Sequence, residues 1–209
     1  MLDVHPPHHP VHAWRDFLLH IATIVVGLLI AIGFEQTVEY VHHRHLLHQA
    51  ERDLRQEMTA NRQYLAMDER QLKGETEQFT DNLRLLDALR AHSATKGELG
   101  FRWYWDGMQS SAWNTARDTG ALALMPYEDA QSFAVVYSQQ ETVNKESEVY
   151  IADIYRIRSP LQGGRKLSDL QPAELDTMIA NTQQTLSDIA HLSDLCKSLD
   201  TIYADAGHQ

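Results

Sequence analysis

The sequence contains little cysteine, glycine or proline. One Cys in 209 residues excludes a disulfide framework and a zinc module built on cysteines. Ten Gly and six Pro are too few for an all-β chain, which needs a turn about every 8 to 12 residues. With 43% hydrophobic and 22% charged residues, the composition is that of a globular protein rather than a disordered one. We therefore predict an all-α fold.

A basic surplus and a catalytic motif are also missing. The formal net charge of −11 at pH 7 argues against nucleic-acid binding, because neutralising phosphates needs a basic face. The sequence contains no GxSxG, Walker loop, HExxH or paired-glycine fingerprint, so it offers no positive evidence for catalysis. Cys196 lies beside an apolar helical stripe with no adjacent His. We expect no enzymatic activity and no catalytic residues or resident organic cofactor.

One uninterrupted apolar run stands near the N-terminus. Residues 17–34 (FLLHIATIVVGLLIAIGF) carry no formal charge, and only His20 and Thr23 are polar. As a helix the run would be about 27 Å long, close to the roughly 30 Å hydrocarbon core of a bilayer. We predict a membrane helix over 14–35, preceded by a His- and Pro-rich tail over 1–13, with the lipid bilayer as partner.

Two other interpretations of this run stay open. A buried core helix of a soluble protein is one, although such a helix normally carries a polar stripe. A cleaved signal peptide is the other, because Ala31-Ile32-Gly33 resembles a cleavage site, although no Lys/Arg cluster precedes the run. Orientation is not decided by Arg15 before the run and Arg44 after it. We favour an N-terminus inside the cell and a translocated, periplasmic domain.

Small and polar residues share one face of the predicted membrane helix. They recur at steps of three and four residues, at His20, Thr23, Gly27, Ala31 and Glu35. Small residues four apart let a second helix approach closely in lipid. This face predicts self-association or contact with other membrane subunits, and chance is the alternative because Gly and Ala are common in membrane helices.

A long extramembrane helix is expected over 36–94, because no Gly or Pro occurs between Phe34 and Lys73. Apolar residues seven apart form one seam, at Met58, Leu65, Leu72, Phe79 and Leu86. The companion positions are polar, at Asn61, Asp68, Glu75 and Asn82. A regular two-stranded coiled coil needs both positions apolar. The seam therefore packs on the rest of its own chain or forms an oligomer with polar layers.

The remaining residues, 95–209, predict three further helices. The first spans Phe101, Trp105, Met108 and Ala112, which share one helical face, and ends at Gly120. The second begins at Pro126 and ends before Ser159, and eight of its positions form an amphipathic stripe. These positions are Phe133, Val136, Gln140, Val143, Ser147, Tyr150, Ile154 and Ile157. The third is entered through Ser168 and Pro172. Short connections predict antiparallel neighbours, so we expect an antiparallel helical bundle that packs on the long helix.

The apolar run with its Gly-Leu-Leu-Ile-Ala stretch, the following VHHRH and the WNTARDTGALALMP segment together resemble a group of uncharacterised bacterial proteins. Members of that group have a short N-terminal tail, one membrane span and a helical soluble domain. The resemblance implies a single-pass protein of the bacterial inner membrane. It brings no catalytic residues with it.

Histidines are unusually frequent, with twelve in the chain. After the membrane helix, His42, His45 and His48 share a helical face with Glu39, a donor set that suits zinc or copper. The three His span about 9 Å of helix axis, more than one ion bridges, so a bend or a second subunit would be needed. The alternative is an interfacial helix whose His lie at headgroup level. The His5 to His12 group predicts only unspecific metal scavenging.

Aromatic residues concentrate in one segment and suggest a ligand pocket lined by Trp103, Trp105, Trp113 and Arg117. A simple hydrophobic core is the alternative. Taken together, these features predict a membrane-anchored, non-enzymatic helical protein that acts as a scaffold, accessory subunit or sensory module, as an oligomer or in a larger membrane complex. The alternatives are a transition-metal-binding protein and a small-ligand sensor.

Overall fold

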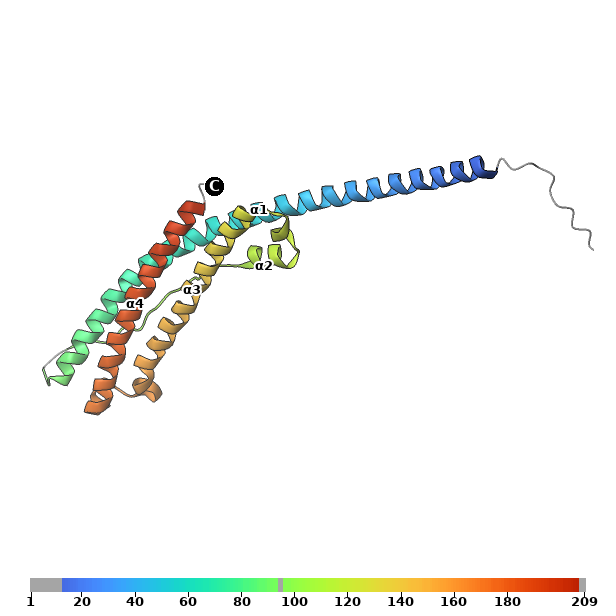
Figure 1. The fold of residues 1–209 in the computed structure, drawn as a ribbon. Helices are drawn as coiled ribbons and strands as arrows, with labels where there is room; N and C mark the ends of the chain where they lie inside the picture. Colours follow the sequence, from blue (N-terminus) through green and yellow to red (C-terminus); the bar gives the residue numbers. More distant parts are fainter. Residues whose placement is uncertain (1–12, 94–95, 207–209) are drawn as a thin grey trace, which may run out of the picture. The chain divides into compact units, whose positions relative to one another are not determined.

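The computed structural model describes residues 13–93 and 96–206. Four α-helices and three short 3-10 helices form the described part of the chain, which contains no strand (Figure 1). The elements in chain order are α1 (Ala13–Arg90), α2 (Ser111–Asp118), η1 (Ala121–Leu124), α3 (Tyr127–Arg158), η2 (Ser159–Gly164), η3 (Leu167–Asp169) and α4 (Pro172–Ala206). The all-α prediction is confirmed. Internal contacts divide the chain into two units, 1–48 and 49–209.

The described part of the first unit is the N-terminal half of α1. Among the described residues, α1 is the one helix that is long and apolar enough to cross a membrane. Its apolar window is not buried against any other part of the chain, and large side chains such as Leu19, Leu29 and Phe34 are more than 60% exposed. The predicted helix is therefore present, and its apolar surface is unshielded.

The second unit uses residues 49–90 of α1 as its central helix. All five residues of the predicted apolar seam are buried, and Leu54 joins them one turn earlier. The four polar companions, Asn61, Asp68, Glu75 and Asn82, are buried as well. Of the two alternatives predicted for the seam, the structure shows packing against the rest of the same chain.

Helices α3 and α4 pack against each other in opposite directions (Figure 1). Near one end, the Tyr203 hydroxyl donates to Gln140 Oε1 at 2.7 Å, and near the other, Asp188 faces Asp153. All eight residues of the stripe predicted for α3 are buried. The buried residues of α4 are Met178, Thr182, Thr185, Ile189, Leu192, Cys196, Leu199 and Tyr203.

Helix α1 runs parallel to α3 and antiparallel to α4. Tyr137 bonds Glu57 and Tyr150 bonds Glu75, so residue numbers on α1 and α3 increase together. The α1–α4 contacts run in opposite order, with Arg62 on Asp200 and Arg90 on Asp176. Among α1, α3 and α4, the pair α3 and α4 is therefore antiparallel, whereas α1 and α3 are parallel. The reason is that residues 97–110 lead back along α1 before α3 begins.

The helix predicted from Phe101 onward is wrong for its first ten residues. Residues 96–110 contain no helix, and α2 starts only at Ser111. Gly120 does end the helical segment as predicted, with a φ of 77°, a left-handed conformation that glycine adopts without steric cost. Side chains of α1 and α3 bond the backbone N–H and carbonyl groups of residues 100–110, and these bonds replace the hydrogen bonds of a helix.

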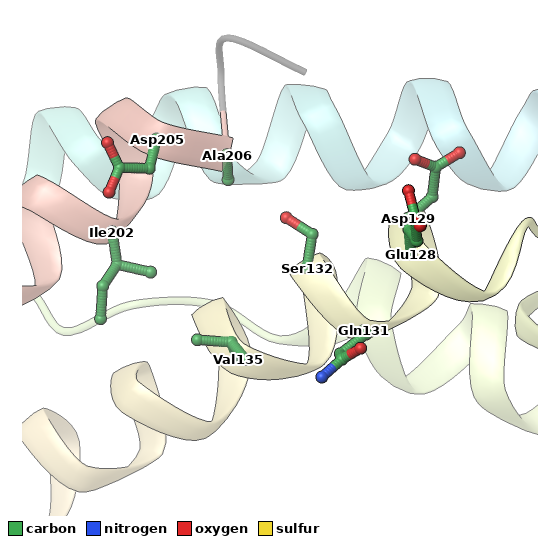
Figure 2. Close-up of a pocket in the computed structure, with 8 residues that line it drawn as sticks. All are labelled: Glu128, Asp129, Gln131, Ser132, Val135, Ile202, Asp205 and Ala206. Atoms are coloured by element: carbon green, nitrogen blue, oxygen red, sulfur yellow. The ribbon is translucent and has the colours of Figure 1, made fainter.

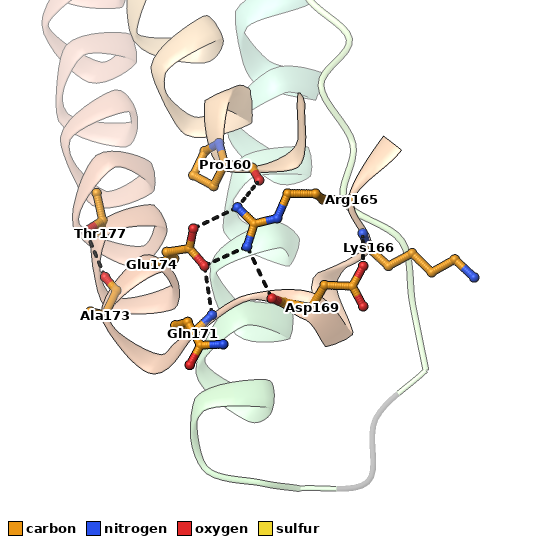
Figure 3. A network of polar contacts seen from close by, with 8 residues as sticks. All are labelled: Pro160, Arg165, Lys166, Asp169, Gln171, Ala173, Glu174 and Thr177. Carbon is orange, nitrogen blue, oxygen red and sulfur yellow. Dashed lines mark hydrogen bonds and ion pairs between the residues drawn. The ribbon is translucent and has the colours of Figure 1, made fainter. Parts of the chain in front are cut away.

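A cluster of polar contacts closes the connection between α3 and α4 (Figure 3). The Arg165 guanidinium makes two bonds to the Glu174 carboxylate, at 2.7 and 2.9 Å. It also donates to the carbonyls of Pro160 and Asp169, both at 3.2 Å. Glu174 in turn accepts the Gln171 backbone N–H at 2.8 Å, which satisfies one of the free N–H groups at the start of α4.

Candidate functional site

The most distinctive site is the surface of α1 that holds residues 100–112, here called the strap. The strap lies antiparallel to α1, since Gly100 bonds Asn82 and Gln109 bonds Asn61. Each backbone contact is made by a side chain of a helix rather than by another extended strand. Eight helical side chains take part, six on α1 and two on α3, Gln140 and Asn144.

Five of these side chains are carboxamides. Gln140 donates to the Gln109 carbonyl at 3.1 Å, and each of the other four pairs with both backbone groups of one strap residue. Asn82 donates to the Gly100 carbonyl at 2.6 Å and accepts its N–H at 2.8 Å. Asn61 does the same with Gln109, at 2.7 and 2.8 Å. The other two pairs are Gln78 with Arg102 and Asn144 with Met108. A carboxamide has the donor and acceptor of a peptide group, so these side chains replace a neighbouring β-strand.

Three carboxylates complete the set, and they accept only from N–H or O–H groups. Glu75 accepts the Tyr104 N–H at 2.7 Å. Asp68 accepts from Asp106 at 2.9 Å and from Gly107 at 3.4 Å. The third, Glu57, accepts the Ala112 N–H at 2.9 Å and the Ser111 hydroxyl at 2.5 Å. Glu57 therefore lies at the first turn of α2, where a negative group is favourable.

The spacing of seven along α1 has a geometric reason. Seven residues of helix advance about 10.5 Å, and three residues of extended chain advance about 10 Å. The 21 helical steps from Asn61 to Asn82 therefore cover nearly the same length as the nine steps from Gly100 to Gln109. A polar residue at every seventh position stays in register with the strap over its whole length.

Two buried carboxyl groups of this site, those of Asp68 and Glu75, have raised pKa values. Burial raises the pKa of Asp68 to about 6, against the opposing effect of the N–H groups of Asp106 and Gly107. Burial also raises the pKa of Glu75, while the Tyr150 hydroxyl and the Tyr104 N–H act in the lowering direction. Tyr150 itself is fully buried and donates to Glu75. The site thus holds two carboxyl groups that are unusually easy to protonate.

The aromatic residues predicted to line one pocket lie in different places. Trp103 lines a hollow of about 530 Å³ beside the strap, together with Gly74 and Glu75. Trp113 and Arg117 line a second hollow of about 530 Å³ between α2 and α3, where Trp113 stacks on Tyr137 with ring centroids 5.1 Å apart. Trp105 is half-buried.

A third hollow lies between the start of α3 and the end of α4 (Figure 2). Carboxylates line much of it, at Glu128, Asp129 and Asp205, with Ser132 and Val135 between them. The sequence analysis did not identify this hollow, because its two sides are about 70 residues apart in the chain.

The predicted metal ligands lie on α1 near the end of the first unit. His42 and His45 are exposed, and the Arg44 Nε donates to His48 Nε2 at 3.5 Å. His43, the neighbour of these residues, lies 3.9 Å from Glu39. Across residues 13–93 and 96–206, no group of three or more His, Cys, Asp or Glu side chains is arranged to hold a metal ion. The metal site stays a prediction, and the His5 to His12 group falls outside the described residues.

The predicted helix-contact face is fully exposed on α1. His20, Thr23, Gly27, Ala31 and Glu35 all lie open, and the Thr23 hydroxyl donates to the Leu19 carbonyl at 2.8 Å. A side chain added at Gly27 would meet nothing within 4 Å. Self-association through this face stays a prediction.

Sequence reasoning identified Asn61, Asp68, Glu75 and Asn82 as polar companions of the seam but did not identify what they bond. It missed Gln78, Glu57 and Asn144 altogether, since a single polar residue on a helix resembles a solvated one. Comparisons with protein-family models, with curated proteins and with solved structures found no match.

Proposed function

We propose that the protein is a membrane-anchored, non-enzymatic helical protein that acts by contact, as a scaffold, accessory subunit or sensory module. One observation supports this most directly. Helix α1 joins an exposed apolar segment of membrane-crossing length to the central helix of a folded unit. Exposing such a segment to water is unfavourable, and a bilayer removes that cost while it leaves residues 49–206 in the aqueous phase.

Residues 49–206 form a helical bundle on the far side of a bacterial inner membrane, in the periplasm. The chain works as an oligomer or within a larger membrane complex. The small-residue face of α1 supports self-association, because the small residues Thr23, Gly27 and Ala31 leave room for a second helix.

The interior of the unit supports action by contact. The strap's backbone groups and the polar residues of α1 bond each other, so these groups are already engaged within the unit. Three large side chains on α3 are about half exposed, at Val135, Val149 and Tyr155. They offer contact points for a partner.

Carbonate extraction of membranes tests the anchoring. The full-length chain should stay in the membrane pellet, because an apolar helix remains in the bilayer at high pH. The double variant Val25→Arg, Leu29→Arg should be released, since arginine at the centre of a span is costly and both side chains are exposed on α1. A matched control is Val25→Leu, Leu29→Ile. Release of the unchanged full-length chain would refute the membrane proposal.

Photo-crosslinking tests the contact role. A photoreactive residue at Val149 should trap a partner or a second copy, and one at Lys197, which is paired with Asp194 on α4, serves as a comparison position. Turnover of a defined substrate by the purified protein, abolished by changes in one hollow, would contradict a non-enzymatic role.

A small-ligand sensor is the second candidate, favoured by the hollow between α2 and α3. There, the stacked pair of Trp113 and Tyr137 lies beside Arg117, and an aromatic wall with a few polar groups suits a small molecule. A ligand that binds the folded state must raise its stability. A thermal-shift screen on the full-length protein should therefore find a ligand whose effect Trp113→Ala removes, and a screen without such a ligand would count against the sensor.

A further inference from the structure

A pair of carboxyl groups, of the buried Asp153 and the half-buried Asp188, joins α3 to α4 away from the strap. Asp153 on α3 is only 3% exposed, and the carboxyl of Asp188 on α4 lies within hydrogen-bonding reach of it. Two ionised carboxylates at this separation repel each other strongly in a poorly solvated environment. The pair therefore needs either a cation or a proton between its oxygens.

The other partners of the two carboxyls show which oxygen lacks a donor. Arg156 on the solvent side donates to Asp153 Oδ1, and Gln184 donates to Asp188 Oδ1 at 2.8 Å. Asp188 Oδ2 is buried, and in the part of the chain that the structure describes no donor bonds it. A buried acceptor left in this state destabilises the folded protein. One proton on Asp188 Oδ2, donated to Asp153, satisfies every group in the pair.

We propose that Asp153 and Asp188 hold one shared proton between α3 and α4, and that loss of this proton loosens the contact between the two helices. The proton belongs to the pair rather than to either residue. With the proton in place, the pair carries a single negative charge, which Arg156 balances from the solvent side. Without it, two negative charges face each other between the helices.

The surrounding charged groups are consistent with a proton-dependent contact. On α3 the charged neighbour is Arg156. On α1 it is Glu75, which accepts from Tyr150, a residue one helical turn before Asp153 on α3. On α4, His191 is exposed and acts on Asp194. Burial, followed by the contact with Asp188, raises the pKa of Asp153 to about 6. The contact between α3 and α4 should therefore weaken as the pH rises from 5 to 8.

The isosteric variant Asp188→Asn tests the proposal, because its amide supplies a permanent donor to Asp153 and still accepts from Gln184. Full-length protein in mild detergent is unfolded with urea at several pH values. The ratio of the folding equilibrium constants of D188N and wild type should rise about tenfold or more between pH 5 and pH 8. Asp205→Asn removes the same charge at an exposed position on α4. The corresponding ratio of D205N to wild type should stay constant across this pH range. Titration of Asp68 or Glu75 affects wild type and variant equally at each pH, so it cancels from the ratio.

A constant ratio for D188N across this range would overturn the proposal. Carbon-13 NMR of the carboxyl groups in the wild-type protein provides a second test that needs no variant. The Asp153 and Asp188 signals should move together in a titration above pH 5. Separate titrations of both groups below pH 5, at ordinary aspartate values, would also overturn it.

Discussion

Asn61 on α1 and Gln109 on the strap exchange two hydrogen bonds, at 2.7 and 2.8 Å, across 48 residues of sequence. Asn61 is fully buried, and its amide therefore serves as a peptide group for a segment that has no β-strand neighbour. The same amide also reaches Gln140 Oε1 on α3 at 3.4 Å. One side chain thus connects α1, the strap and α3.

Asn61→Asp should destabilise the helical unit by about 1 to 3 kcal/mol. The carboxylate cannot donate to the Gln109 carbonyl, which keeps only its 3.1 Å bond from Gln140, and a buried carboxylate oxygen then faces that carbonyl. Urea unfolding followed by tryptophan fluorescence measures the effect, since three of the four Trp lie at or near the strap. Gln63→Glu makes the same chemical change at an exposed neighbour and should have little effect. Equal stability of the two variants would contradict the role of Asn61.

Asp68 should make the unit less stable as the pH rises through about 6. Its folded-state pKa is raised to about 6 by burial, so the folded state binds the proton more tightly than the unfolded state does. The resulting stability is fully present below about pH 4 and is lost as the pH passes through 6. With allowance for solvent screening, the loss should be about 1 to 2 kcal/mol.

Urea midpoints measured between pH 4 and pH 7 test this prediction. Asp68→Asn should make the pH dependence less steep, whereas the exposed Asp81→Asn on the same helix should leave the slope near that of the wild type. An unchanged slope in D68N would show that Asp68 titrates equally in the folded and unfolded states.

Arg165→Ala should raise the pKa of Glu174 toward its ordinary value. In the structure, the Arg165 guanidinium is the largest cause, and the Gln171 N–H the second, of a pKa lowered to about 2. A lowered carboxyl pKa stabilises the folded state above about pH 4.5, and this contribution is lost as the pH falls toward 2. NMR titration of the Glu174 carboxyl carbon measures the change. Arg158→Ala, at the exposed end of α3, is the control, and an unmoved Glu174 titration in R165A would rule out the contact in solution.

Gly27→Leu should weaken self-association without disturbing the fold of the chain, because a side chain at Gly27 meets nothing within 4 Å in one copy. Native mass spectrometry in mild detergent measures the fraction of oligomer. Val25→Leu places a leucine on the opposite side of the helix and should leave the oligomer intact. Only monomer in the wild type, or identical distributions for both variants, would argue against this face as an interface.

Local periodicity was enough to predict the long helices. The stripe of eight residues on α3 is buried in full, because apolar side chains at steps of three and four have one stable arrangement, with that face turned inward. The apolar run over 17–34 likewise predicted a helix of membrane-crossing length. Length and hydrophobicity determine both features without reference to the rest of the chain.

The strap depended on tertiary structure. Phe101, Trp105, Met108 and Ala112 have the spacing of a helical face, yet residues 100–110 are not helical, because side chains of α1 and α3 satisfy their backbone groups at the cost of helical bonds. The polar residues every seventh position on α1 were visible in the sequence, but their partners lie 18 to 48 residues away. The sequence alone determined which residues would form long helices and which positions on α1 broke the apolar pattern. Only the tertiary structure decided that a returning extended segment, with matching rise along the helix axis, would bond those positions.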